Sequence, residues 1–283
     1  MSVQLSGRSL FVEANGLRHH LRAYGAEGTP AAMLLPGITS PAATADFVAA
    51  RLARQGFAVY VPDIRGRGET DVPPAGSYTL RHYADDVAGL VTTLELARPV
   101  VIGHSMGARI AAAYATEYAP GAHGPVVLVD PPLSGPDRGP YPTSLESFMA
   151  QLSEARAGTT IEAVRRFYPK WPERELRLRL EALPSCDETA IRETHAGFES
   201  EDFFPYWRAL TAPALLIYGL ESPVVTARGA EDLHAANPVV PMIGVPGAGH
   251  MIPWDNYDGF FEALLPWLAA VVPAGVSKQS KGE

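Results

Sequence analysis

Residues 99–109 read PVVIGHSMGAR, an apolar run that leads into the pentapeptide GHSMG at residues 103–107. The apolar run is typical of a buried strand, and the small residues that follow are typical of a helix packed closely against it. A serine at such a junction, with a glycine two residues to either side, is exposed by a sharp turn in which the two backbones approach closely. We therefore interpret Ser105 as a nucleophile, and the alternative is a simple glycine-bounded turn.

Strands and helices alternate outward from this stretch. Near the start of the chain, Asn15-Gly16 predicts a hairpin turn because both residues tolerate positive φ. Further runs that suit buried strands are AAMLLPG at 31–37, AVYVPDI at 58–64, PVVLVDPP at 125–132, PALLIYG at 213–219 and a strand around 241–245. Helices are expected near 42–55, around 83–94, at 106–119, near 227–236 and up to about 271. This order predicts an α/β fold with a mostly parallel, eight-stranded sheet flanked by helices.

The alternation breaks between residues 133 and 210, a segment rich in Pro, Arg and aromatic residues. An irregular loop of that length would be exceptional, so we expect an inserted, mostly helical cap. The predicted organisation is a core made of residues 1–132 and 211–272, a cap at 133–210 and a flexible tail at 273–283.

Composition narrows the classes of partner. The chain has 23 basic and 31 acidic residues, a formal net charge of -8, and its basic residues form no run that would follow a phosphate backbone. Nucleic acid is therefore not an expected partner. The N-terminus lacks the apolar stretch of a signal peptide, and no segment is long and apolar enough to span a bilayer, so we expect a cytoplasmic protein without membrane contact. Oligomeric state is left open.

Cysteine usage argues against metal chemistry based on thiolates. Cys186 is the sole cysteine, so neither an internal disulfide nor a cysteine cluster for a metal is expected. We interpret it as a small buried apolar side chain, and we expect no metal and no cofactor.

A nucleophilic serine needs a base and donors for the oxyanion. Of the eight histidines, His250 lies in a glycine-rich loop after the last expected strand, where the chain order serine, acid, histidine places the base. The backbone N–H of Met106, at the helix start, is one expected oxyanion donor. The N–H of Ile38, in the loop PGIT after an earlier strand, is the other, unless that loop is merely a turn.

Two carboxylates compete for the role of the acid. In this architecture the acid usually follows the seventh strand. There the chain reads YGLESPVV at 218–225, and Ser222 stands where the acidic residue, an aspartate, is expected. Glu221 is one residue away and would need the loop to rearrange. Asp130 ends the apolar run VVLVD one strand nearer the nucleophile, and a carboxylate buried there needs a partner such as histidine. We favour Asp130 and keep Glu221 as the alternative.

The motifs PGITSPAAT, DIRGRG, GHSMGAR, LVDPPLSGP followed by YP, and AGHMIPWDNYDGFF together resemble the N-formylmaleamate deformylases of bacterial nicotinic acid degradation. These are members of the α/β-hydrolase superfamily, and the resemblance covers nearly the whole chain. It implies a cofactor-free hydrolase that releases formate from N-formylmaleamate and leaves maleamate. It also implies Ser105, Asp130 and His250 as the catalytic triad, in agreement with the reading of the residues.

The implied substrate carries a carboxylate, which needs a cationic partner when buried. In WPERELRLRL at 171–180, Arg179 falls about 60° from the centre of the expected apolar helix face and Arg177 about 100°. We therefore expect Arg179 to bind the substrate, with Tyr168 and Trp171 as walls of the pocket or, equally, as core of the cap.

Three other functions stay open. The related hydrolases of acetamidomethylenesuccinate also place their acid after the sixth strand, and a general carboxylesterase would share every catalytic residue. A ligand-binding receptor on the same fold, with slow or absent turnover, belongs to a different class.

Overall fold

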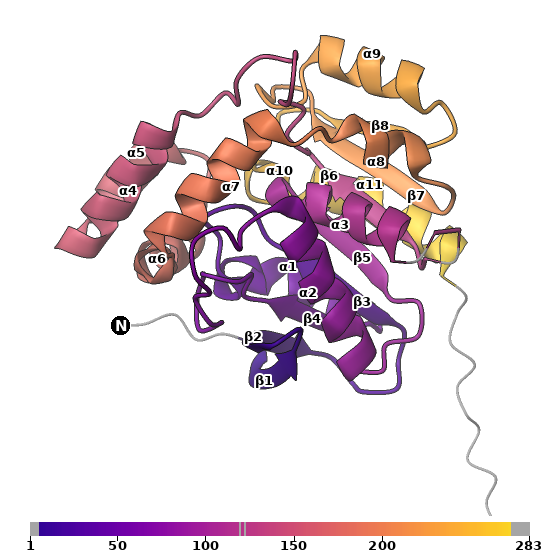
Figure 1. The fold of residues 1–283 in the computed structure, drawn as a ribbon, viewed down its shortest axis with the longest axis horizontal. Coiled ribbons are helices and arrows are strands. Elements are labelled where there is room, and N and C mark those ends of the chain that lie inside the picture. The colour runs from indigo at the N-terminus through magenta and orange to yellow at the C-terminus, as the bar shows by residue number, and fades with distance from the viewer. Residues whose placement is uncertain (1–5, 119, 122, 273–283) are drawn as a thin grey trace, which may run out of the picture.

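The computed structural model describes residues 6–118, 120–121 and 123–272, and the predicted tail at 273–283 lies outside the described residues. Its centre is an eight-stranded sheet with the order β1-β2-β4-β3-β5-β6-β7-β8 (Figure 1). The strands are β1 (Arg8–Ala14), β2 (Leu17–Tyr24), β3 (Ala31–Leu35), β4 (Ala58–Pro62), β5 (Val100–His104), β6 (Val126–Val129), β7 (Ala214–Gly219) and β8 (Met242–Val245). β1 pairs antiparallel with β2, and β2 antiparallel with β4, whereas the other pairs are parallel. The predicted fold class is confirmed.

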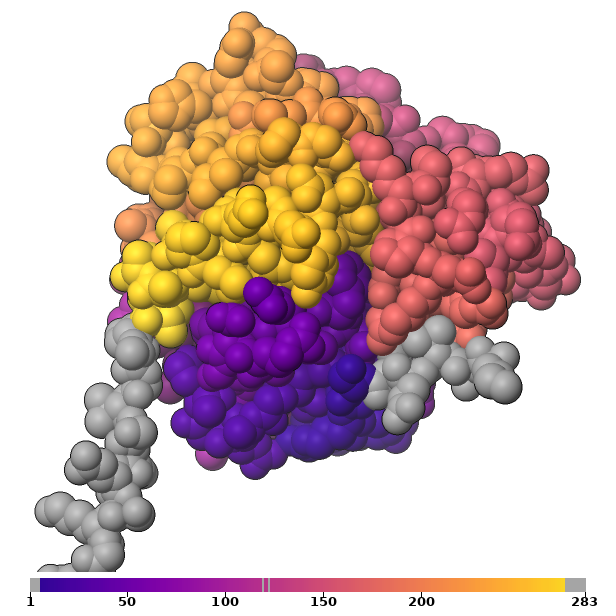
Figure 2. Space-filling view, turned by 180° about the vertical axis from the view of Figure 1, so that it is seen from behind, coloured from indigo at the N-terminus to yellow at the C-terminus, as the bar shows by residue number. Residues whose placement is uncertain are grey.

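Helices cover both faces of this sheet. One face packs against α1 (Asp46–Arg54) and α11 (Tyr257–Val271), and the other against α2 (Leu80–Thr93), α3 (Met106–Glu117) and α9 (Ala227–Ala236). The side chains of β6 alternate between these two faces. Val127 and Val129 pack on the side of α1 and α11, and Val126 and Leu128 pack on the side of α2, α3 and α9, as the two-residue period of a strand requires. Figure 2 shows the first face, with α11 in yellow beside the purple residues of α1. Apolar runs without alternation therefore mark strands buried on both sides.

Five helices lie between β6 and β7. They are α4 (Leu145–Gly158), α5 (Ile161–Phe167), α6 (Glu173–Ala182), α7 (Glu188–Ser200) and α8 (Phe204–Ala209), with a short 3-10 turn at Leu183–Ser185. The first three project beside the sheet and form a lobe (Figures 1 and 2). By contrast, α8 packs on α9, where the indole N–H of Trp207 donates to the carbonyl of Leu233 at 2.8 Å. The division into cap and core at residue 210 stays a prediction, and α8 contacts the core helices.

The helix expected near 42–55 differs in its first turn. Residues Ala42–Ala45 form a 3-10 turn, and the α-helix begins at Asp46. Buried side chains hold this junction, because the Ala42 N–H donates to Asp63 at 2.6 Å and the Tyr24 hydroxyl donates to Asp46 at 3.0 Å. These tertiary bonds override the local helical pattern. No helix of the described residues has the length and apolar character needed to cross a membrane.

Candidate active site

The turn between β5 and α3 presents Ser105 at the carboxyl edge of the sheet. Its backbone has φ 56° and ψ −120°, a conformation that L-residues rarely adopt. The turn is possible because neither flanking glycine has a Cβ. A Cβ on Gly103 would overlap the carbonyl of Gly107, and one on Gly107 would overlap the carbonyl of Leu35. The two glycines of GHSMG are therefore required by close backbone approach, and they leave the Ser105 side chain buried but facing a cavity.

His250 joins Ser105 to a carboxylate. It lies in the loop between β8 and α10 (Ile252–Asp255), with Nε2 2.9 Å from Ser105 Oγ and Nδ1 2.7 Å from Asp130 Oδ2. Because a carboxylate accepts hydrogen bonds, Nδ1 carries the proton and Nε2 is free to accept the proton of the serine hydroxyl. This tautomer is the one a general base requires.

The structure distinguishes the two candidate acids. Asp130 follows β6, is fully buried, and bonds His250 from the strand next to the nucleophile strand. Glu221 follows β7, but its side chain is exposed and pairs with Lys170 Nζ at 3.0 Å. The structure thus brings Asp130, and not Glu221, to the imidazole, in the arrangement that the sequence favoured.

Ser222, which stands after β7 where an acidic residue was expected, also contacts Asp130. The Ser222 hydroxyl donates to Asp130 Oδ2 at 2.6 Å, and the Gly219 N–H donates to Asp130 Oδ1 at 3.3 Å. Sequence reasoning treated Ser222 only as a missing aspartate. Its position, three residues after the end of β7 at the same edge of the sheet, was the available signal.

The two expected oxyanion donors flank Ser105. The loop after β3 passes so close that a Cβ on Gly37 would lie 3.4 Å from the Ser105 Cβ. The carbonyl of Ile38 accepts from Nε of the buried Arg67 at 3.0 Å, which ties this loop to a buried side chain. Met106 begins α3, where backbone N–H groups have no acceptor inside the helix. Both residues are therefore adjacent to the nucleophile.

A cavity of about 290 Å³ opens beside these residues. Its walls come from the β3 loop, the nucleophile turn, the His250 loop and the helices α4, α5 and α6; among the lining residues are Thr39, Ser147, Phe148, Gln151, Phe167 and Met251. Tyr141 is a lining residue that sequence reasoning did not single out as part of the site. Its hydroxyl lies 3.4 Å from His250 Nε2 and its ring packs against Phe148 and Phe198. The Tyr-Pro after LVDPPLSGP was its signal in the sequence.

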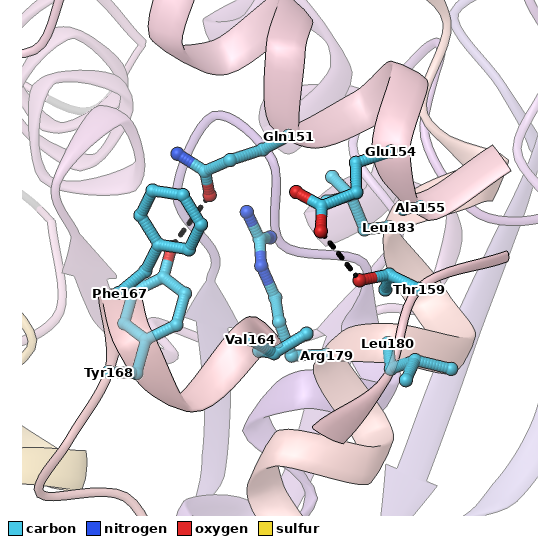
Figure 3. A pocket seen from close by; sticks show the side chains of 10 residues that line it. All are labelled: Gln151, Glu154, Ala155, Thr159, Val164, Phe167, Tyr168, Arg179, Leu180 and Leu183. Atoms are coloured by element: carbon cyan, nitrogen blue, oxygen red, sulfur yellow. Dashed lines mark hydrogen bonds between the residues drawn. The ribbon is translucent and has the colours of Figure 1, made fainter. Parts of the chain in front are cut away.

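Arg179 lies in the wall of this cavity. Its guanidinium donates to the carbonyl of Thr39 and, at 2.9 Å, to the Thr39 hydroxyl, while Nε has no partner. None of the ion pairs among residues 6–118, 120–121 and 123–272 includes Arg179, although the residue is 4% exposed. Figure 3 shows it between Tyr168 and Glu154 in a smaller adjoining cavity. A buried cation without a carboxylate partner is costly, so the site favours an anion.

The other two predicted pocket residues differ from each other. Tyr168 lines the cavity, its ring centre 5.7 Å from the Arg179 guanidinium carbon. Trp171 does not line it, but is buried and stacks between Tyr168 at 4.1 Å and Trp254 at 5.2 Å. Trp171 therefore supports the wall from behind. Within the part of the chain that the structure describes, no three His, Cys, Asp or Glu side chains are grouped as a metal site.

Comparison with known proteins agrees with this geometry. Residues 33–257 match the family described as alpha/beta hydrolase fold. The chain belongs to the α/β-hydrolase family. The serine hydrolases of that family expose the serine on a strand-to-helix turn, with an acid and a histidine that follow it in the chain.

Within the family, the chain is similar to the N-formylmaleamate deformylase of Pseudomonas putida strain KT2440. The two are 40% identical over 257 residues, which cover 91% of this chain and 95% of the relative. A crystal structure of a Pseudomonas putida N-formylmaleamic acid deformylase superposes with a TM-score of 0.84 at 36% identity, and covers 91% of this chain and 100% of that chain. The 2-(acetamidomethylene)succinate hydrolase of Mesorhizobium japonicum is 31% identical over 79% of this chain and 82% of its own. The resemblance inferred from the sequence motifs is confirmed.

Proposed function

We propose that this chain is a serine hydrolase that cleaves the formyl C–N bond of N-formylmaleamate and yields maleamate and formate. The observation that carries the proposal is the hydrogen-bonded chain from Ser105 through His250 to Asp130, open to a cavity whose wall includes an arginine without a carboxylate partner. The similarity to N-formylmaleamate deformylases supports the choice of substrate.

Acylation begins with His250. Nε2 takes the hydroxyl proton of Ser105 as the oxygen attacks the formyl carbon, and Asp130 holds the imidazole tautomer and stabilises the imidazolium. The backbone N–H groups of Ile38 and Met106 donate to the oxyanion of the tetrahedral intermediate. The position of each group around Ser105 supports these proposed roles.

The intermediate then collapses toward the leaving group. The C–N bond breaks, and the proton on His250 Nε2 passes to the nitrogen, so that maleamate leaves and Ser105 retains a formyl ester. That nitrogen also carries the maleyl carbonyl, so it is a better leaving group than an amine nitrogen. Water activated by His250 attacks the ester, and formate leaves as the serine hydroxyl is regenerated.

The substrate carboxylate is assigned to Arg179. A bidentate arginine contact is the strongest partner that a side chain offers a carboxylate, and this guanidinium has no carboxylate of its own. Tyr168 is proposed to wall the same part of the cavity. Trp171 keeps a supporting role through its stack on Tyr168.

A second candidate is favoured by the 31% identical hydrolase of 2-(acetamidomethylene)succinate, whose named substrate is an N-acetylated compound. The cavity does not distinguish a formyl from an acetyl group by any contact described above. Measurement must therefore decide between the two, and a general carboxylesterase remains the third outcome.

The test is a comparison of products. The purified full chain is incubated with N-formylmaleamate, with acetamidomethylenesuccinate and with a simple aryl ester, and formate, acetate and phenol are measured over many turnovers. We expect formate at the highest kcat/KM and no activity in Ser105→Ala. Acetate in excess of formate would favour the second candidate, and a single slow turnover would indicate a receptor.

Two further statements stay predictions: the chain is cytoplasmic, and residues 133–210 form a cap.

A further inference from the structure

The turn after β7 is built around the Ser222 hydroxyl. This side chain is 7% exposed, and its oxygen accepts from the backbone N–H of Val224 at 3.0 Å and of Val225 at 3.4 Å. A hydroxyl has two acceptor sites and one donor. Since the turn amides occupy the acceptor sites, the single proton is directed elsewhere.

That proton goes to Asp130. Ser222 Oγ and Asp130 Oδ2 are 2.6 Å apart, a length typical of a hydroxyl that donates to a charged carboxylate. The same oxygen accepts Nδ1–H of His250 at 2.7 Å. Ser222 and His250 therefore share one oxygen of the acid, and the Gly219 N–H holds the other at 3.3 Å.

Asp130 needs this support for a structural reason. Its backbone has φ 49°, in the left-handed region, and its side chain is excluded from solvent. The two residues that follow, Pro131 and Pro132, have no N–H to offer the carboxylate. The donors must therefore come from the neighbouring strand end, and Ser222 supplies the shortest of the described bonds.

We propose that Ser222 is a positioning residue of the triad: its hydroxyl fixes the rotamer of Asp130 and shares its negative charge with His250. The turn after β7 does not supply the carboxylate that bonds His250, but it still supports that carboxylate, Asp130, from the adjacent strand. The inference rests on the proposed serine chemistry of Ser105, His250 and Asp130, although not on the identity of the substrate.

The direction in which Ser222→Ala changes the pH dependence of kcat/KM follows from the oxygen of Asp130 that Ser222 and His250 share. In Ser222→Ala the carboxylate loses one donor, so its charge is less dispersed and stabilises a protonated His250 more strongly. A higher pH is then needed to free the base. The acidic limb of the kcat/KM profile moves upward, and kcat/KM at its plateau falls about tenfold to a hundredfold because the imidazole is less well oriented.

The experiment compares Ser222→Ala and Ser222→Thr with Thr226→Ala. The threonine variant keeps the hydroxyl and should recover most of the activity. Thr226 is an exposed residue of the same loop whose hydroxyl accepts from the Gly229 N–H at 3.1 Å without contact to Asp130, so its loss is the matched control. Should Ser222→Ala not fold, Ser222→Cys, which is close in size and a weaker donor, replaces it.

Two readouts do not depend on the natural substrate. One is the pH dependence of the rate at which a fluorophosphonate labels Ser105, and the other is the low-field proton resonance of His250 Nδ1–H. We expect both to change in Ser222→Ala, to recover in Ser222→Thr and to be unaltered in Thr226→Ala. An unmoved acidic limb and resonance in Ser222→Ala, with only reduced stability, would overturn the inference. Failure of the wild-type chain to release formate would count against the proposed substrate alone.

Discussion

Nε2 of His104 donates a 2.9 Å hydrogen bond to the backbone carbonyl of His250. Because a carbonyl only accepts, this bond fixes the tautomer of His104, whose Nδ1 has no partner among the described residues. Burial, with the neighbouring His250 imidazole as a smaller cause, lowers the pKa of His104 to about 3. The residue before the nucleophile therefore holds, as a neutral ring, the loop that carries the base.

This pKa predicts a dependence of stability on pH. Unfolded His104 binds a proton below its ordinary pKa of 6.5, whereas the folded form does not until about 3. The unfolded state thus gains protons first, and stability falls by about 1.4 kcal/mol per pH unit as pH drops from 6.5 toward 3. Urea unfolding at several pH values should show a flatter dependence in His104→Gln, and an unchanged one in His234→Gln on the exposed surface. Parallel curves for all three proteins would refute the assignment.

The acid is tested by paired amide substitutions. Asp130→Asn removes the charge that stabilises the imidazolium and can reverse the tautomer, so we expect kcat to fall by about 10⁴. Glu221→Gln affects only an exposed pair with Lys170, and we expect less than a twofold change. Steady-state kinetics on N-formylmaleamate and on an aryl ester measure both. A larger loss in the glutamate variant would reverse the assignment.

Arg179 should affect binding more than folding. Arg179→Met keeps the length of the side chain and removes a buried cation that has no carboxylate partner, but it also removes two hydrogen bonds to Thr39. These effects oppose each other, so the free energy of unfolding should change little. The loss of a charged contact to the substrate carboxylate should lower kcat/KM for N-formylmaleamate about tenfold or more.

Two controls separate these effects. A neutral aryl ester should lose much less activity than the anionic substrate in Arg179→Met. Arg177→Met, which removes a partly buried arginine paired with Glu173 at 2.7 Å, should leave both substrates unaffected. Equal losses for both substrates in Arg179→Met would mean that the arginine supports the Thr39 loop instead of the substrate.

Two glycine-to-alanine variants distinguish the loss of stability caused by a steric overlap from the loss caused by an unfavourable backbone conformation. A Cβ in Gly107→Ala would overlap the carbonyl of Leu35, so either strand or helix must shift, and we expect a loss of about 3 kcal/mol. Gly28 has φ +81° but open space around it, so Gly28→Ala should lose only about 1 kcal/mol. Urea midpoints of the two variants provide the comparison. A smaller loss at Gly107 than at Gly28 would contradict the close packing of β3 and α3.

Helical periodicity predicted the direction of Arg179 correctly. Arg179 is buried toward the cavity and Arg177 is only partly buried, as their angles from the apolar face indicated. The buried face is broader than expected, because Leu178 is buried too. Periodicity describes one face of a helix, and α6 contacts neighbours on more than one side. The same limit explains Trp171, whose place behind Tyr168 depends on Trp254, 83 positions further along the chain.

By itself, the sequence determined the fold and pointed to Ser105 as the candidate nucleophile, because continuous apolar strands, glycine spacing and the order of elements are local patterns. It also limited the acid to two residues, Asp130 and Glu221. Only the tertiary structure brought His250 to Asp130, turned Glu221 to the surface and placed the Ser222 hydroxyl on the acid. These contacts join separate loops at one edge of the sheet, and their distances depend on the strand order and on the conformation of each turn.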